Sequence, residues 1–415
     1  MEKAMKFPYG ISDFFKLVTE GYFYLDRTDH IPLIEAAGSQ LLFLRPRRFG
    51  KSLLLSMLEN YYDVAKADEF QRLFGHLYIG QNPTLLHNQY FVLKWDFSGV
   101  SPLGDAERIE RTLHDYINGC IERFVARYRG WIEYDIMFDV NNALRSFQSL
   151  LAAIERTPYR LYLLIDEYDH FAKALIGEQP QGSSRYTELL HAEGVLKMLF
   201  KAVKAASSGR GLDRAFISGV LPVTLSDVSS GYNIAVNTFL QPNFQDLCGF
   251  CESEVTETLQ QVVEACGWPA DKTAEALEMM RASCNGYRFS YTAEEPIYNP
   301  TLALHFFEAL QRERQHPRNL LDGNLAMDRN EIVYVAQLPN GEGVVKQALD
   351  GGHPLSVVQL ADRFGVEDML HTVKDRAFMI SLLYYSGMLT LAGYTSLGKL
   401  AFRIPNQVVR GLYVE

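Results

Sequence analysis

Short apolar runs that end directly in polar residues recur through the first half of the chain. Leu41–Leu44 precedes a turn rich in arginine, and Leu161–Ile165 precedes two acidic residues. Runs of this length between polar turns predict buried strands. Further strands are predicted over 90–97, where Phe91, Leu93, Trp95 and Phe97 alternate with other residues, and over 214–220.

Between these runs, apolar residues recur at helical spacing. The stripes are Ile109, Leu113, Ile117, Ile121 and Phe124, then Leu144, Phe147, Leu150, Leu151 and Ile154, followed by a helical pattern over 188–206. Strands that alternate with helices predict an α/β fold, in which a parallel sheet is covered by helices on both faces. Ligands of such sheets bind at the carboxyl ends of the strands.

The pattern changes after about Phe244, where helical stretches begin to dominate. Helices are predicted over 254–266, 273–284, 301–312 and 368–385, and short strands over 388–392 and 400–404. A helix followed by a β-hairpin favours a winged-helix-like unit. We therefore expect an α/β domain over 1–245 and a mainly helical lid or winged-helix-like domain over 246–415.

The turn after the first apolar run carries the strongest chemical signal. It reads Arg45-Pro-Arg-Arg-Phe-Gly-Lys-Ser52, and a helical pattern follows it. Backbone N–H groups at such a helix start face phosphate oxygens, Lys51 would reach the terminal phosphates, and Ser52 would offer its hydroxyl to Mg²⁺. The expected nucleotide-binding residues here are Arg45, Arg47, Arg48, Phe49, Gly50, Lys51, Ser52 and Leu53. Gly-Lys-Ser alone is as well explained by a chance match on a surface turn, and Arg45 stands where the usual first glycine would be.

The acidic pair after the second run supports the same interpretation. Asp166 would hold Mg²⁺ through its hydration shell, and Glu167 would accept a proton from an attacking water. Ser218, at the end of a later strand, is a candidate sensor of the terminal phosphate. Taken singly, the acids fit a helix cap and Ser218 fits a simple turn. Together with Lys51 and Ser52 they predict an Mg²⁺-dependent ATP site, with Glu167, Lys51 and Ser218 catalytic and with Ser52 and Asp166 at the metal.

Two further parts of the site are predicted less directly. Ile11, Phe14 and Tyr24 precede the first strand and are apolar enough to sandwich a base, although a core role fits each of them equally well. Arg288 lies beyond the domain boundary, where its planar fork suits a phosphate. A structural ion pair with Glu294 or Glu295 is the favoured alternative for Arg288.

The bulk properties exclude some classes of protein. The 415 residues carry a formal net charge of −10, which argues against a protein that coats nucleic acid nonspecifically. No apolar stretch approaches the ~20 residues needed to span a bilayer, and no secretory signal is visible, so we expect a cytoplasmic protein. Five cysteines indicate reduced thiols. Cys248 and Cys251 have metal-knuckle spacing, but Cys251 and Glu254 also fit a helix start.

Several segments together resemble the bacterial AAA-ATPase-like family. They are Gly21–Thr28, Arg45–Ser52, Leu163–Asp169, Phe216–Gly219, Gly286–Ser290, Tyr298–Pro300 and Ile404–Asn406. The resemblance spans nearly the whole chain, and it accounts for the missing first glycine. It implies an ASCE-type P-loop ATPase, akin to the STAND and archaeal ATPase groups, commonly followed by a PD-(D/E)XK nuclease domain. No such nuclease array follows Ile404, so the chain resembles the ATPase half.

Three hypotheses follow from these observations. The leading one is an ATPase whose nucleotide state switches a conformation. The second is a nucleotide-gated interaction module that acts in defence against foreign DNA, with a homo-oligomer, a nuclease domain or another protein as its partner. The third is DNA binding by the C-terminal unit through Lys399, Arg403 and Arg410, for which a solvated face is the commoner explanation.

Overall fold

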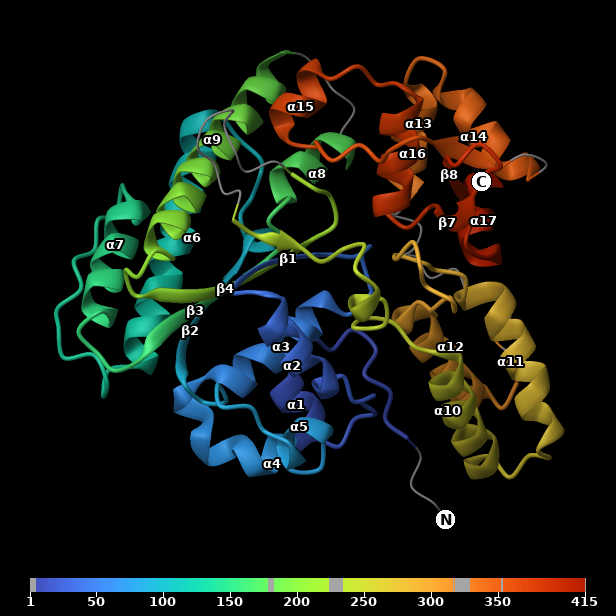
Figure 1. The fold of residues 1–415 in the computed structure, drawn as a ribbon, viewed down its shortest axis with the longest axis horizontal. Coiled ribbons are helices and arrows are strands. Elements are labelled where there is room, and N and C mark those ends of the chain that lie inside the picture. The colour runs from blue at the N-terminus through green and yellow to red at the C-terminus, as the bar shows by residue number, and fades with distance from the viewer. Residues whose placement is uncertain are drawn as a thin grey trace.

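The computed structural model describes residues 5–177, 183–223, 234–315, 317, 329–351 and 354–414. A five-stranded parallel sheet lies at the centre of the first half of the chain (Figure 1). Its strands are β1 (Gln40–Leu44), β2 (Tyr90–Asp96), β3 (Arg160–Asp166), β4 (Leu212–Gly219) and β5 (Val236–Asn237). The order across the sheet is β2-β3-β4-β1-β5, so β4 separates β1, which precedes Arg45–Ser52, from β3, which ends in Asp166. This is the additional-strand arrangement that the ASCE resemblance implies.

Helices cover both faces of the sheet. One face carries α6 (Ala106–Arg127), α7 (Ala143–Ile154) and α9 (Ser183–Ala206). The other face carries α3 (Lys51–Tyr62), with α1 (Phe14–Thr19), α2 (Ile31–Ala37), α4 (Phe70–Phe74) and α5 (Tyr78–Gln81) around it, as Figure 1 shows. The predicted stripe of α6, from Ile109 to Phe124, is buried. The α/β fold is confirmed.

The C-terminal region contains two groups of elements. The first consists of α10 (Glu252–Ala265), α11 (Asp271–Cys284) and α12 (Pro300–Glu313), which share a separate apolar core with Phe7 and Val408. The second consists of α13 (Arg329–Gln337), α14 (Gly341–Asp350), β6 (Leu355–Val357), α15 (Val366–His371), α16 (Arg376–Tyr385), β7 (Thr390–Tyr394), β8 (Leu400–Arg403) and α17 (Gln407–Val414). Apolar residues of this second group join the core of the five-stranded sheet.

Three local predictions differ from the structure. The single helix expected over 368–385 is two helices, because Asp375 accepts a hydrogen bond from Phe378 N at 2.8 Å and so starts α16 as a new helix. The hairpin gains a third strand, β6, which pairs antiparallel with β8. The helix expected over 188–206 begins earlier, at Ser183. Cys251 and Glu254 do start a helix, as predicted, since Cys251 N donates to Glu254 Oε2 at 2.7 Å.

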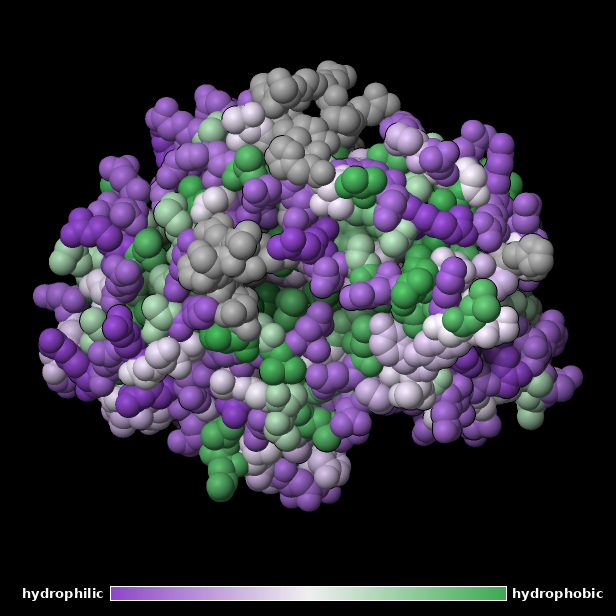
Figure 2. Space-filling model, turned by 45° about the horizontal axis from the view of Figure 1, so that its top comes forward, coloured by the Kyte–Doolittle hydropathy of each residue, from purple (hydrophilic) through white to green (hydrophobic). Residues whose placement is uncertain are grey.

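The surface is polar over most of the face seen in Figure 2, and apolar residues gather toward its middle. No helix among the described residues is both long enough and apolar enough to cross a membrane.

Candidate nucleotide site

Residues 45–50, between β1 and α3, form a tight loop that leaves the start of α3 open. This loop is called the P-loop below. Gly50 precedes the helix with φ 89°, and Arg48 also has a positive φ of 65°. Glycine adopts this conformation without the penalty that a side chain brings. The result is a helix N-terminus of the kind that binds phosphate through its backbone N–H groups.

A cavity of about 540 Å³ opens at this helix start. It lies between the N-terminal segment, the P-loop, the segment before α10 and the start of α12. Its lining residues are Pro8, Tyr9, Gly10, Ile11, Ser12, Leu17, Phe23, Tyr24, Leu25, Arg27, Arg47, Arg48, Phe49, Gly50, Lys51, Ser52, Leu53, Leu54, Met57, Glu167, Leu247, Cys248, Gly249, Phe250, Pro300, Thr301 and Leu304. Most of these residues are apolar. Four of the charged ones, Arg47, Arg48, Lys51 and Glu167, belong to the loop after β1, the start of α3 or the position directly after β3, whereas Arg27 pairs with Glu254. This division suits a ligand with a flat apolar part and a charged tail.

The structure brings most of the predicted site residues to this cavity. Those that line it are Ile11, Tyr24, Arg47, Arg48, Phe49, Gly50, Lys51, Ser52, Leu53 and Glu167. Phe14 is fully buried and stacks on Phe74, so it belongs to the core. Burial raises the pKa of the Tyr24 phenol, so Tyr24 presents a neutral ring.

Arg45 is placed elsewhere, and its interpretation as a nucleotide ligand is corrected. Its side chain is fully buried, and it donates hydrogen bonds to the carbonyls of Leu44, Phe239 and Phe244. The guanidinium lies 4.7 Å from the ring centroid of Phe43 and 4.3 Å from that of Phe289. Burial lowers the pKa of Arg45 to about 10. This arginine therefore joins the P-loop strand to later segments and does not face the cavity.

Asp166 connects three strand ends through hydrogen bonds. Ser52 Oγ donates to Asp166 Oδ2 at 2.6 Å, and Ser218 Oγ donates to Asp166 Oδ1. Ser52 is the second residue of α3, which follows β1, Asp166 ends β3, and Ser218 lies near the end of β4. A serine hydroxyl and a carboxylate are hard oxygen donors of the kind that Mg²⁺ prefers, so this pair fits the ion.

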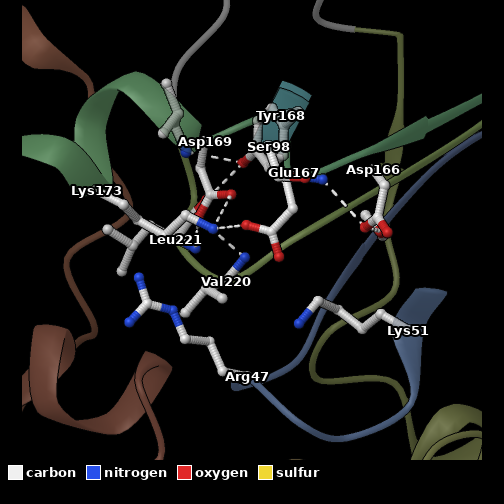
Figure 3. Close-up of polar contacts among 12 residues, drawn as sticks. Arg47, Lys51, Ser98, Asp166, Glu167, Tyr168, Asp169, Lys173, Val220 and Leu221 are labelled. Carbon is white, nitrogen blue, oxygen red and sulfur yellow. Dashed lines mark hydrogen bonds and ion pairs between the residues drawn. The ribbon is translucent and has the colours of Figure 1, made fainter. Parts of the chain in front are cut away.

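Glu167 and Lys173 form an ion pair beside the cavity. Glu167 has φ 54°, which is uncommon for a residue with a side chain, and its carboxylate contacts Lys173 Nζ. Lys173 lies on α8 (His170–Gly177) and also approaches Asp169 Oδ1 at 3.2 Å. Figure 3 shows the Lys173 ammonium between the carboxylates of Glu167 and Asp169, with Arg47 and Lys51 below them in this view.

Lys51 is buried and held by its own loop. Its Nζ donates to the carbonyls of Arg45 and Pro46, each at 3.0 Å. Burial lowers the pKa of Lys51, while the nearby Asp166 and Asp169 act in the opposite direction. The ammonium therefore lies inside the loop between β1 and α3.

Comparisons with known proteins give a family match, a curated relative and a solved structure. The family described as "Predicted AAA-ATPase" matches residues 8–229, which is more than half of the 415-residue chain. The chain belongs to this predicted AAA-ATPase family.

One curated relative and one solved structure add context. The chain is 24% identical over 323 residues to an uncharacterized protein encoded in the vnfD 5′ region of Azotobacter chroococcum mcd 1. That match covers 73% of this chain and 52% of the relative, so the chain spans about half the relative's length. The Aeropyrum pernix ORC1 protein, solved in complex with DNA, matches with 12% identity and a TM-score of 0.31, covering 96% of this chain and 95% of that one.

Several residues of this candidate site were not predicted from the sequence. Leu247–Phe250 and the start of α12 line the cavity, and Thr301 Oγ1 donates to Arg48 O at 2.9 Å. Both segments lie about 200 residues or more from the P-loop in the sequence, and no local signal links them to it. Lys173 had a signal in the sequence, because it follows Asp169 by four residues, the spacing at which side chains meet along a helix.

The basic residues proposed for other roles lie away from this cavity. Arg288 donates to the backbone carbonyl of Glu294 at 3.1 Å, and its own N–H donates to Thr390 Oγ1 at 2.7 Å. It therefore has a structural partner at Glu294, although through the carbonyl and not the carboxylate. In the C-terminal unit, residues Phe378–Tyr385 of α16 are all buried, so this helix is covered in the present arrangement. Arg410 donates to Leu349 O at 2.8 Å.

Proposed function

We propose that this protein binds ATP with Mg²⁺ and hydrolyses it to switch the position of its C-terminal region. One observation carries the proposal: the hydroxyls of Ser52 and Ser218 meet on Asp166, and Glu167, the next residue, lines the same cavity as the P-loop. Family membership supports the ATPase chemistry at a coarse level.

Each residue has a defined task in this reaction. The start of α3 and Lys51 bind the phosphates, with Lys51 exchanging the carbonyls of Arg45 and Pro46 for phosphate oxygens. Ser52 and Asp166 would hold Mg²⁺, which when bound neutralises charge on the phosphate oxygens. Ile11 and Tyr24 lie on the apolar side of the cavity, where the base would lie.

Hydrolysis needs a base close to the terminal phosphate. Glu167 accepts a proton from water as the water oxygen bonds to the terminal phosphorus. The bond from that phosphorus to the bridging oxygen breaks, and ADP and phosphate are the products. Ser218 orients the Asp166 carboxylate beside this centre.

Two contacts support a switch that reaches the C-terminal region. Arg47 in the P-loop lies 3.7 Å from Glu331 on α13, and Thr301 on α12 donates to the carbonyl of Arg48. A phosphate that draws Arg47 would alter the first of these contacts.

The first test separates binding from hydrolysis. Purified protein should release phosphate from ATP, and Glu167→Gln should bind ATP yet hydrolyse it at least ~100-fold more slowly, since general acid–base catalysis contributes about 10²–10⁴-fold. If the wild-type protein binds ATP and releases no phosphate, it is a nucleotide-gated interaction module and the ATPase proposal is wrong.

The second test concerns the phosphate cradle. Lys51→Ala should weaken ATP binding by on the order of tenfold to a hundredfold, because a charge-assisted contact is lost while the backbone remains. Equilibrium titration with a fluorescent ATP analogue measures this. Lys66→Ala is a matched control, since Lys66 lies beyond α3 in a 3₁₀ turn (Val64–Glu69) and does not line the cavity. Equal affinities in all three proteins would mean that the loop is not a phosphate site.

A further inference from the structure

Lys173 is a buried cation that the proposed reaction does not yet use. Its side chain is only 7% exposed, and it bridges Glu167 and Asp169. Figure 3 shows its ammonium between the carboxylates of Glu167 and Asp169. Lys173 does not itself line the cavity, and Glu167 is the residue through which it meets the cavity. Burial lowers the pKa of Lys173 well below its usual range, and the positive charges of Lys51 and Arg47 act in the same direction. A cation in such surroundings depends on the anions beside it.

The two anions beside Lys173 differ in how firmly they are held. Asp169 Oδ2 accepts hydrogen bonds from Val220 N at 3.0 Å and Leu221 N at 2.8 Å, just beyond β4. Gly219 allows this close approach, because a Cβ there would lie 2.8 Å from Asp169 Oδ1 and 2.6 Å from the ring of Tyr168. Asp169 is therefore a fixed anchor for one side of the lysine.

Glu167 is the partner that faces the cavity. It lines the cavity, whereas Asp169 does not, and its side chain is 23% exposed. While its carboxylate is paired with the ammonium, its lone pairs are engaged and it is a weaker base for water. A terminal phosphate entering beside Glu167 would bring negative charge close to that carboxylate, and both anions would compete for Lys173.

We propose, on the basis of the proposed function, that Lys173 is a positioning residue that responds to the terminal phosphate of a bound triphosphate. Its ammonium stays paired with Asp169, and its contact with Glu167 is replaced by a contact with an oxygen of the terminal phosphate. Glu167 is then released to accept the proton from water only when a triphosphate is bound. ADP lacks the third phosphate and leaves the Lys173–Glu167 pair intact.

The test compares two nucleotides in binding, without hydrolysis. Calorimetry with Mg²⁺ measures the affinities of wild-type protein and Lys173→Met for a nonhydrolysable ATP analogue and for ADP. We expect Lys173→Met to weaken the ATP analogue by about tenfold or more and ADP by less than about threefold. Lys173→Arg, which keeps the charge, should restore most of the preference for the triphosphate.

A second variant covers the case in which Lys173→Met does not fold. Removing the lysine leaves Asp169 buried without its cation, so Lys173→Met is combined with Asp169→Asn, which removes that charge. The control is Asp169→Asn alone, which keeps Lys173 and should keep the preference for the triphosphate. The double variant should lose the preference for the triphosphate.

The outcomes separate this inference from the proposed function. If wild-type protein binds and hydrolyses ATP but the ratio of the two affinities is unchanged in the folded Lys173 variants, Lys173 has only a structural role. A parallel loss of both affinities has the same meaning. If wild-type protein shows no binding that depends on Lys51, the proposed function fails, and this inference fails with it.

Discussion

At the scale of single residues, two arginines of one loop, Arg45 and Arg47, lie in different environments. Arg45 is buried among aromatic rings and backbone carbonyls, whereas Arg47 lines the cavity with its side chain 39% exposed. Arg45→Ala should lower the free energy of unfolding by about 3–5 kcal/mol, because three buried carbonyls lose their donor and a cavity remains. Urea denaturation measures this loss.

Arg47→Ala is the matched control for that substitution. It should change stability by less than about 1 kcal/mol, since its ion pair is partly exposed, and it should chiefly weaken nucleotide binding. If Arg45→Ala instead keeps full stability and loses nucleotide binding, the assignment of Arg45 to the core would be wrong.

At the scale of elements, His30 ties the turn before α2 to the segment that leads into the C-terminal region. Its ring nitrogens lie 2.8 Å from Asp29 Oδ1 and 3.1 Å from Asp246 Oδ1. Although burial lowers the pKa of His30, hydrogen bonds to Asp246 and Asp29 raise it to about 9. The folded protein thus binds this proton more tightly than the unfolded chain, where the pKa is about 6.5.

This raised pKa gives stability a defined pH dependence. The contribution of His30 is fully present below pH about 6.5 and is lost as pH rises through about 9, and it amounts to roughly 3 kcal/mol. The difference in unfolding free energy between wild type and His30→Gln should therefore shrink between pH 6.5 and 9.5, as measured by urea denaturation at each pH. A difference that is constant over this range would rule out the ion pair as its source.

At the scale of the whole molecule, the P-loop and the C-terminal region are expected to be energetically coupled. Glu331→Gln removes the carboxylate that lies near Arg47 and should tighten ATP binding by about fivefold, a coupling free energy of about 1 kcal/mol. Because coupling is reciprocal, ATP should also make α13 more accessible to protease in the wild-type protein. Titration with an ATP analogue and limited proteolysis measure the two effects.

Glu342→Gln is the matched control, because Glu342 lies on α14 of the same unit and pairs with Lys346 at 2.6 Å on the surface. It should leave ATP affinity unchanged. Equal affinities for the Glu331 and Glu342 variants would show that the ion pair does not connect the two regions.

The sequence by itself determined the parts of this protein that depend on local pattern. Short apolar runs placed β1, β3 and β4, because a strand buried on both faces must be largely apolar, and alternating apolar residues placed β2. Polar residues at the ends of parallel strands meet at one edge, so Ser52, Asp166 and Ser218 were expected together, and they are hydrogen-bonded. The apolar stripes at helical spacing likewise predicted α6 and α7.

Only the tertiary structure decided which charges face the cavity. Arg45 and Arg47 are two residues apart in one loop, and what buries Arg45 is its contact with Phe239, Phe244 and Phe289, far along the chain. The two-residue strand β5 and the three-residue strand β6 exist through pairing with β1 and β8, which no short pattern specifies. Likewise, the contact between Lys173 and Glu167 forms because α8 packs so that the Lys173 ammonium lies beside the Glu167 carboxylate. Spacing along the chain does not by itself specify this contact.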